Sequence, residues 1–450
     1  MMQAPKGIRL HISVFGRTNV GKSCFVNLVV GQKVSITSCH PGTTTDVVDK
    51  VMELLPLGPV VFHDTAGLDD RSLLGAKRVD ATKRVLNRTD VALLVLEPDR
   101  MSQEEEVFAA LVAKRSIPII AVVNKADLSV PRASFLKRVH DLTPHVFVCS
   151  SVSSVNRDAV LAKLKAALIS VCPERFIAPP PLVGDLVPPG GQIVLIVPID
   201  LEAPKGRLIL PQVQTIRDAL DHGLATVVIK DDAIGATLER FSALPDLAVC
   251  DSQVVDTMVS ELPLAVPCTT FSILFARLKG DLGVFAEGAE AIDTLRDGDR
   301  VLIAESCSHH PVEDDIGRVK IPRWLREYTG ARLEFNIYAG HDFPSDLSSY
   351  RLVVQCGGCV HNRREMLTRI ENAQAAGVAI TNYGICISKT HRVLERVLSP
   401  FRLASRQYDI AAMKNRNGMP RALRKEENSY DNVHTHYDTS VLVTDTARPD

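Results

Sequence analysis

The sequence has almost no net charge and no long apolar run. Its 52 basic and 53 acidic side chains leave a formal charge of -1 over 450 residues. That balance provides no basic field for phosphate backbones, which disfavours tight, sequence-independent binding of nucleic acid by the whole chain. The most apolar segments, such as 193–199 and 301–304, have the length of strands and cannot span a bilayer. We therefore expect no membrane span and no nucleic-acid partner.

An export signal and the cysteine spacing of radical-SAM enzymes are also absent. The segment 1–9 is too short before the first expected strand to be a signal or transit peptide, so we expect a cytoplasmic protein. No loop holds three cysteines at the spacings of three and two residues that radical-SAM enzymes use. The ten cysteines should then be reduced thiols that are available to metals rather than paired in disulfides.

The composition is typical of a folded protein with about three domains. Hydrophobic residues make up 46% and charged residues 23% of the chain. Alternating strand and helix patterns predict an α/β protein, in which a P-loop GTPase domain is followed by two further α/β domains. We place the GTP-binding domain at 1–175, an interaction domain at 176–262, a cluster-binding domain at 263–405 and a mobile polar tail at 406–450.

A phosphate-binding loop is predicted near the N-terminus. A β-rich segment at 8–15 leads into Gly16-Arg17-Thr18-Asn19-Val20-Gly21-Lys22-Ser23, and a helix-like segment follows. In this pattern backbone amides wrap the phosphates, the lysine reaches the β and γ oxygens, and the serine hydroxyl binds magnesium. The residues assigned to nucleotide binding here are Gly16, Asn19, Gly21, Lys22 and Ser23, and Ser23 is also a magnesium ligand.

Two further motifs complete a guanine nucleotide site. Asp64 and Gly67 belong to Asp64-Thr65-Ala66-Gly67, where the carboxylate should hold magnesium through water and the glycine amide should sense the γ-phosphate. Asn124, Lys125 and Asp127 end the strand expected at 117–123. A carboxylate at Asp127 accepts both N–H groups of guanine, whereas adenine would leave its charge unpaired, so GTP is the expected nucleotide. Ser150 follows the next strand and should close the base pocket.

The segment Pro41-Gly42-Thr43-Thr44-Thr45-Asp46 is predicted to be a switch loop, with Thr44 as the second hydroxyl ligand of magnesium. The ordered motifs resemble the TrmE-Era branch of GTPases, in which arginine stands where this chain has Thr45. That resemblance implies a potassium ion held by Asn19; the alternative is that Asn19 only supports the loop. Leu68 stands where Ras-like proteins have a water-orienting glutamine, which predicts slow hydrolysis or help from another group.

The middle of the chain has strand and helix patterns but no constellation of ligands. Proline-rich stretches at 178–181 and 187–191 predict a stiff linker in front of it. The segment 204–207 could suggest phosphate binding, but it lacks further glycines and is interpreted as a turn. We therefore expect an interaction surface, with a homodimer as the first expectation because homodimers are the commonest partnership.

Three cysteines of the third domain follow expected strands. Cys307 comes after a strand at 300–305, and Cys356 and Cys359 come after one at 350–355. Sites form at the carboxyl ends of neighbouring strands in open α/β sheets, so the thiols can share one metal. Thiolates bind both zinc and iron–sulfur clusters. The alternatives are structural zinc that adds His309 to the three cysteines, a Cys-x-x-Cys redox pair, and unrelated core cysteines.

The order of motifs is similar to that of the HydF family of FeFe-hydrogenase maturation GTPases. The likeness covers roughly 7–405 and rests on 203–212, 307–310, 315–325 and 356–359. It implies that Cys307, Cys356 and Cys359 carry a 4Fe-4S cluster whose fourth position is weakly held or exchangeable. His309 is the first candidate for that position, and the other candidates are His310, His341, His361, Glu305 and water. Gln355 stands where the family usually has a second histidine.

The resemblance also implies a role. A protein of this kind is a GTPase scaffold that receives a dinuclear iron precursor from two radical-SAM maturases and delivers it to apo FeFe-hydrogenase, with the GTP cycle as a switch. Its cofactors would be GTP, Mg²⁺, the 4Fe-4S cluster and K⁺. The rival interpretation is a TrmE-Era type ribosome or RNA assembly GTPase with a structural zinc site. The near-neutral charge and the lack of a recognisable RNA-binding motif count against the rival.

Overall fold

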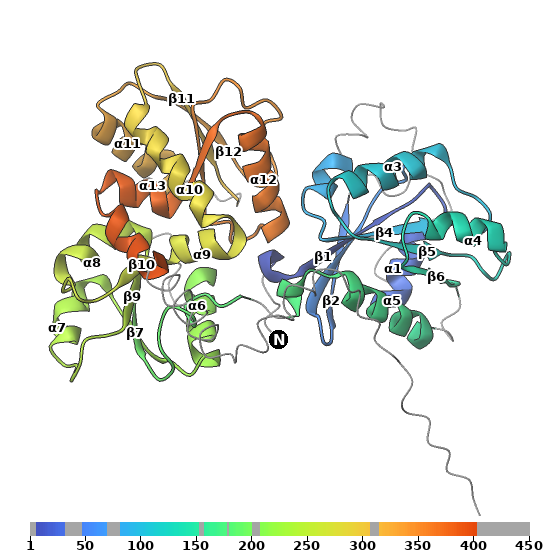
Figure 1. The fold of residues 1–450 in the computed structure, drawn as a ribbon, viewed down its shortest axis with the longest axis horizontal. Helices are drawn as coiled ribbons and strands as arrows, with labels where there is room; N and C mark the ends of the chain where they lie inside the picture. Colours follow the sequence, from blue (N-terminus) through green and yellow to red (C-terminus); the bar gives the residue numbers. More distant parts are fainter. Residues whose placement is uncertain are drawn as a thin grey trace, which may run out of the picture. The chain divides into compact units, whose positions relative to one another are not determined.

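The computed structural model describes residues 6–31, 47–69, 82–152, 157–177, 180–199, 208–306 and 315–402. The chain divides into a compact unit, residues 1–399, and a second unit, residues 400–450. The first unit contains three sheets, each with its own helices (Figure 1), which confirms the expected α/β class. Among the described residues no helix is both long and apolar enough to cross a bilayer. The tail expected to be mobile at 406–450 lies outside the described residues.

The first sheet has six strands in the order β2-β3-β1-β4-β5-β6. Its strands are β1 (Leu10–Phe15), β2 (Val48–Leu54), β3 (Gly58–Asp64), β4 (Val91–Leu96), β5 (Ile119–Val123) and β6 (Val146–Val148). β2 and β3 form an antiparallel hairpin, and the other pairs are parallel. β1 and β4 are buried along their whole length, as central strands of a sheet covered on both faces should be.

Helices cover both faces of the first sheet (Figure 1). They are α1 (Lys22–Val30), α3 (Gln103–Lys114), α4 (Ala133–His140) and α5 (Arg157–Val171). α1 and α5 share one core with β1, through side chains such as Phe25 and Leu164, while α3 and α4 pack in a second core around Phe108 and Val139. The apolar burial on both faces holds β1 and β3 rigidly, so that their carboxyl ends can position a site.

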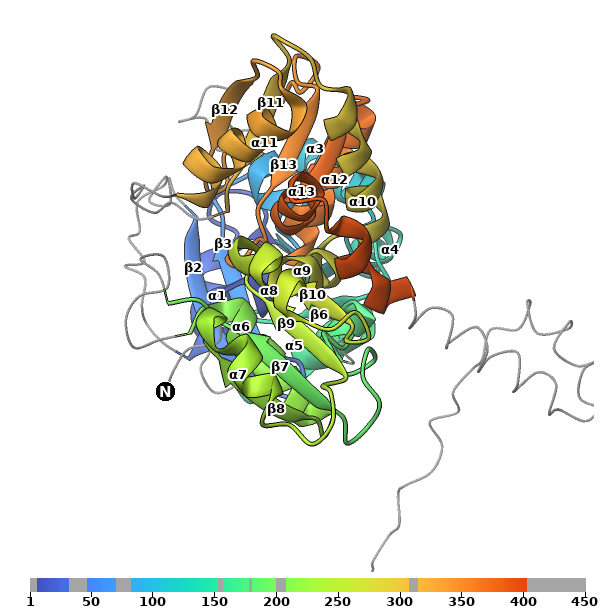
Figure 2. The same ribbon diagram turned by 90° about the vertical axis from the view of Figure 1, so that its left-hand side faces the viewer.

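The second sheet has four parallel strands in the order β10-β9-β7-β8 (Figure 2). Its elements are β7 (Gln192–Ile196), α6 (Leu210–Asp221), β8 (Ala225–Ile229), α7 (Ile234–Leu238), β9 (Leu247–Cys250), α8 (Val255–Glu261) and β10 (Cys268–Thr270). β10 lies within the segment expected to begin the third domain at residue 263, but it pairs with β9 and so belongs to the second sheet. A short sequence pattern does not say which neighbour a strand pairs with.

The third sheet also has four parallel strands, in the order β12-β11-β13-β14. Its elements, with α9 before them, are α9 (Phe271–Lys279), α10 (Leu282–Ala289), β11 (Arg300–Ala304), α11 (Ile321–Thr329), β12 (Glu334–Tyr338), β13 (Leu352–Gln355), α12 (Arg363–Ala375), β14 (Ala379–Asn382) and α13 (Tyr383–Thr390). α10 begins at Leu282, because the Asp281 side chain accepts a hydrogen bond from the Val284 amide and caps the helix there.

Short helical turns connect several of these elements. They are η1 (Lys6–Ile8), η3 (Glu174–Phe176), η4 (Asp231–Ala233), η5 (Ser252–Val254), η6 (Glu290–Thr294) and the π-helical turn η7 (Ile316–Lys320). α10 continues directly into η6.

Candidate nucleotide site and metal centre

The predicted phosphate loop connects β1 to α1. Gly16 and Gly21 have φ values of 147° and 95°, which favour glycine, and Asn19 has φ 64°. A Cβ atom at Gly21 would lie 2.3 Å from the side-chain nitrogen of Asn124, so the loop also needs glycine there for space. These conformations let successive backbone amides line a concave loop in front of the α1 N-terminus. Asn19, the residue predicted to hold potassium, is exposed on this loop.

Lys22, Ser23 and Asp64 are brought together at the ends of β1 and β3. The Lys22 Nζ donates to the backbone oxygens of Gly16 and Arg17 at 3.1 and 2.8 Å. Burial raises the pKa of Asp64, and a hydrogen bond from Ser23 and the Lys22 charge oppose that effect. The Asp64 Oδ1 is buried without a hydrogen-bond partner among the described residues. A magnesium ion with its waters would satisfy that oxygen, so these side chains fit the predicted metal.

The segment after β3 touches the phosphate loop. A Cβ atom at Gly67 would lie 2.2 Å from the Thr18 hydroxyl, and the Leu68 amide donates to the Gly16 oxygen at 3.0 Å. The Thr18 amide and hydroxyl in turn donate to Asp69. A change at the γ-phosphate position would therefore reach residues 67–69 directly. The predicted switch loop with Thr44 lies outside the described residues.

The predicted base-binding residues lie after β5 and β6. The Asn124 side chain donates to the Val20 oxygen at 3.0 Å and accepts from the Ser151 amide at 3.0 Å, which ties this motif to the phosphate loop. Lys125 has φ 62° and forms an ion pair with Glu97. Asp127 is exposed, and the Ser150 hydroxyl is buried without a partner among the described residues. Both polar groups are available to a base.

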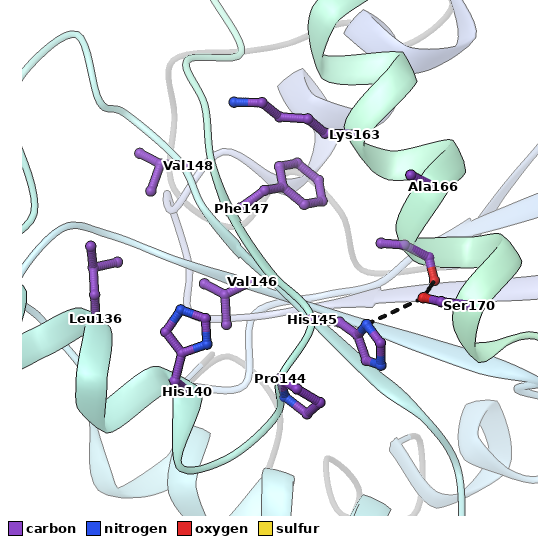
Figure 3. Close-up of a pocket in the computed structure, with 11 residues that line it drawn as sticks. Leu136, His140, Pro144, His145, Val146, Phe147, Val148, Lys163, Ala166 and Ser170 are labelled. Carbon is purple, nitrogen blue, oxygen red and sulfur yellow. Dashed lines mark hydrogen bonds between the residues drawn. The ribbon is translucent and has the colours of Figure 1, made fainter. Parts of the chain in front are cut away.

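A separate pocket of about 640 Å³ lies between α4, β6 and α5 (Figure 3). Its lining includes His140, His145 and Lys163, and the Ser170 hydroxyl lies 3.2 Å from the His145 Nδ1. No residue predicted to bind the nucleotide lines it. It is therefore not the GTP site.

Two predicted cysteines lie at the carboxyl end of the third sheet. β13 ends at Gln355 beside β11, and the Ser306 amide, just beyond β11, lies 3.1 Å from the Cys356 Sγ. The Cys356 thiol also donates to the Ser306 hydroxyl at 2.9 Å. Neither Cys356 nor Cys359 is in a disulfide. Cys307, His309 and His310 lie outside the described residues, but the chain leaves β11 at the edge where Cys356 lies.

A buried lysine that the sequence did not point to holds the Cys-x-x-Cys segment. The Lys279 Nζ, at the end of α9, donates to the backbone oxygens of Gly358, Cys359 and His361 at 2.7, 3.4 and 3.0 Å. Burial lowers the pKa of Lys279 to about 8, against the charges of the two thiolates. Burial raises the pKa of the Cys359 thiol to about 11. A cation beside two thiols that are not in disulfides suits an anionic thiolate-bound cluster. The sequence did not indicate this role, because a single lysine forms no motif with its neighbours.

Gln355 has a structural role. Its amide nitrogen donates to the Ala304 oxygen at 3.1 Å, and its oxygen accepts from Arg369 at 3.1 Å. Arg369 also contacts Glu365, which lies beside His341 and His361. Burial lowers the pKa of His361 to about 3, so its imidazole is neutral at ordinary pH. Glu365 has a pKa of about 2, since the His341 hydrogen bond and the positive charges nearby outweigh its burial.

The segment after Cys359 also contacts the first domain. The Asn362 side chain donates to the Arg88 oxygen at 2.8 Å and to Asp90 at 3.1 Å. Asp90 in turn accepts from the His11 amide in β1 and from Arg175. Burial raises the pKa of Asp90 to about 6, although Arg175 opposes the shift. The strand that leads to the phosphate loop and the segment that carries two cysteines therefore share one buried carboxylate.

Three family models match successive parts of the chain. A model described as the hydrogen maturase F dimerization domain matches residues 182–280, and one described as the hydrogen maturase F tetramerization domain matches residues 283–400. The chain belongs to the hydrogen maturase F family. A third model, described as a 50S ribosome-binding GTPase, matches residues 11–125, so the family's two domains follow a GTPase domain.

Two curated relatives each match about a third of the chain or less. GTPase Der of Kosmotoga olearia is 34% identical over 34% of this chain and 38% of its own length. GTPase Era of Geotalea daltonii is 37% identical over 28% of this chain and 43% of its own length. The chain thus spans about two fifths of these curated relatives. A crystal structure of Aquifex aeolicus Era bound to GDP.AlF4- covers 52% of this chain and 99% of that chain, at 20% identity and a TM-score of 0.32.

Proposed function

We propose that this chain is a GTPase scaffold in FeFe-hydrogenase maturation, which carries a 4Fe-4S cluster and delivers a dinuclear iron precursor to apo-hydrogenase. The family match over residues 182–400, joined to a GTPase domain, supports this role most directly. The free thiols beside Lys279 support the cluster. Radical-SAM maturases are the proposed donors of the precursor, and a homo-oligomer is the proposed working form.

The nucleotide site supports slow GTP hydrolysis. Lys22 and the loop amides would hold the phosphates, Ser23 and Asp64 would hold magnesium, and Asp127 would read the guanine edge. Leu68 is buried and apolar, so it cannot orient the attacking water. Slow turnover suits a switch rather than a metabolic enzyme. If Asn19 holds potassium against the phosphates, hydrolysis will be faster in potassium than in sodium, and equal rates would remove that role.

The cluster would be held by Cys307, Cys356 and Cys359, with His309 as the proposed fourth ligand. When bound, it would supply an iron site with an exchangeable position for the cargo. The protein's own contribution is to fix two thiols at the end of β13 and to supply a buried ammonium beside them.

The coupling between nucleotide and cluster would run through the Asp90–Asn362 contact, because Asp90 also binds the β1 backbone. A transfer assay tests the proposal. Chain loaded with the precursor is mixed with apo-hydrogenase in the presence of GTP, GDP or a non-hydrolysable analogue, and hydrogen evolution is followed. We expect the rate or extent of activation to depend on the nucleotide. Activation that is the same in all three states would contradict the switch, and no activation at all would contradict the delivery role.

A further inference from the structure

Two histidines and a glutamate form a cluster in the third domain. His341 lies on the loop between β12 and β13, while His361 precedes α12 and Glu365 lies in its first turn. One ligand atom from each residue lies within 4.8 Å of the others. The sequence pointed to the two histidines only as alternative cluster ligands, and it gave no reason to add Glu365. Glu365 follows His361 by four residues, and the first turn of α12 brings its carboxylate beside that imidazole.

The distances from each histidine to Glu365 are close to those between ligands of one metal ion. The His341 Nδ1 lies 3.0 and 3.1 Å from the two carboxylate oxygens of Glu365, and the His361 Nε2 lies 3.5 Å from one of them. Ligands about 2.0–2.2 Å from a tetrahedral ion lie roughly 3.3–3.6 Å apart. Small side-chain movements would therefore suffice. His341 can make them, since 55% of its side chain is exposed.

His361 gives an independent sign of a missing partner. Its residue is 1% exposed, and neither ring nitrogen has a hydrogen-bond partner among the described residues. A buried imidazole without a partner leaves polar atoms desolvated, which costs about 1–3 kcal/mol. Its Nε2 faces the Glu365 carboxylate rather than solvent. A metal ion between these groups would satisfy both.

We propose that His341, His361 and Glu365 form a site for one divalent first-row transition metal ion, separate from the cysteine site. Two imidazoles and one carboxylate are the ligand set of mononuclear zinc sites and of iron(II) sites with open positions. Such a set discriminates against magnesium and calcium, which prefer oxygen ligands. The exposed side of His341 gives the ion a route in and leaves room for water or cargo ligands.

Two existing contacts would change when the ion binds. His341 Nδ1 lies within hydrogen-bond distance of Glu365, and Arg88 lies 3.4 Å from His341 Nε2. The ion would replace the contact between His341 and Glu365, and the Arg88 contact would loosen on the exposed side. Arg369, 3.4 Å from the Glu365 Oε1, would keep that carboxylate oriented from the buried side. Arg369 therefore supports the site on its buried side, and the side of His341 is open to solvent.

Cobalt(II) titration of the full-length, cluster-free chain under anaerobic conditions tests the proposal. Thiolate-bound cobalt shows ligand-to-metal charge transfer in the near ultraviolet, whereas a site of nitrogen and oxygen ligands shows only visible ligand-field bands. We expect both classes in the native chain. His361→Gln and Glu365→Gln should each weaken the nitrogen–oxygen class by more than about a hundredfold, and should leave the thiolate class unchanged. His391→Gln, at a partly buried histidine outside the cluster, serves as the control.

The surviving thiolate signal shows that the variants fold. Zinc and iron(II) should each displace the cobalt from the nitrogen–oxygen class, and their order of displacement identifies which ion the site favours. Excess magnesium should not displace it. The proposal is overturned if native chain shows only thiolate-bound cobalt, if the nitrogen–oxygen class survives both substitutions, or if magnesium competes. It is also overturned if both classes are lost together in variants with native melting temperatures, since His361 would then belong to the cysteine site.

Discussion

Asp127 is the single side chain that we expect to select the purine base. Replacing its carboxylate by an amide in Asp127→Asn gives up two charge-assisted hydrogen bonds to guanine and places an N–H donor where xanthine has a carbonyl. A loss of about 1.5–3 kcal/mol corresponds to roughly 10–150-fold weaker GTP binding. XTP binding should strengthen in parallel. Fluorescent-nucleotide titration measures both, and Asp141→Asn on the exposed end of α4 is the control. Unchanged GTP affinity would rule out this role.

The raised pKa of Asp90 predicts that the stability of the folded chain decreases as the pH rises. Its folded pKa of about 6 lies above the ordinary 3.8, so the folded state holds the proton more tightly than the unfolded state does. The stability that this provides is complete below pH 3.8 and is lost as pH rises through 6, about 3 kcal/mol in all and roughly 1 kcal/mol between pH 5 and 7. The melting temperature of native chain should therefore fall relative to Asp90→Asn over that range. A flat or rising difference would contradict the shift.

Among the structural elements, the segment 356–362 is held by two separate parts of the chain. Lys279 on α9 binds its carbonyls, and Asn362 ties it to the first domain. In Lys279→Met the three carbonyls lose their donor and the thiolates lose a nearby positive charge. We expect iron to leave the reconstituted protein several-fold faster when a chelator is added. Lys389→Met, at a lysine paired with Glu290, is the control. Equal rates of iron loss would show that Lys279 only supports the fold.

Motifs with fixed local geometry could be predicted from the sequence, whereas contacts between distant segments could not. The phosphate loop lies between a strand and a helix as expected, because Gly16 and Gly21 are required by the backbone itself. The pairing of β10 with β9 and the three hydrogen bonds of Lys279 depend on long-range packing, which a single sequence does not encode in any short pattern. The contact of His341 with Glu365 also joins separate segments, 24 residues apart, so the sequence did not indicate it.

Two edge strands, β8 and β12, indicate how copies of the chain associate. β8 ends the second sheet with Val228 44% exposed, and β12 ends the third with Ile337 38% exposed. Parallel sheets rarely leave such strands uncovered. The descriptions of the matched domains, dimerization and tetramerization, agree with two interfaces. We expect light scattering to give half of the native mass for Val228→Lys. For Ile337→Lys we expect the larger assembly to be lost while the dimer remains.

The control for this prediction is Leu264→Lys, at a residue that is 89% exposed and lies in a loop outside both edge strands. Its mass should equal that of the native chain. If all three variants kept the native mass, neither edge strand would be an interface.

We propose that a GTPase and an iron–sulfur scaffold share this chain. Iron and sulfide analysis with electron paramagnetic resonance, on full-length protein reconstituted without oxygen, distinguishes this scaffold from a zinc protein. We expect brown protein with about four iron and four sulfide per chain, as a 4Fe-4S cluster requires, and loss of the reduced-cluster signal in Cys356→Ser and Cys359→Ser but not in Cys386→Ser. Colourless protein that holds stoichiometric zinc at the same cysteines would rule out the cluster.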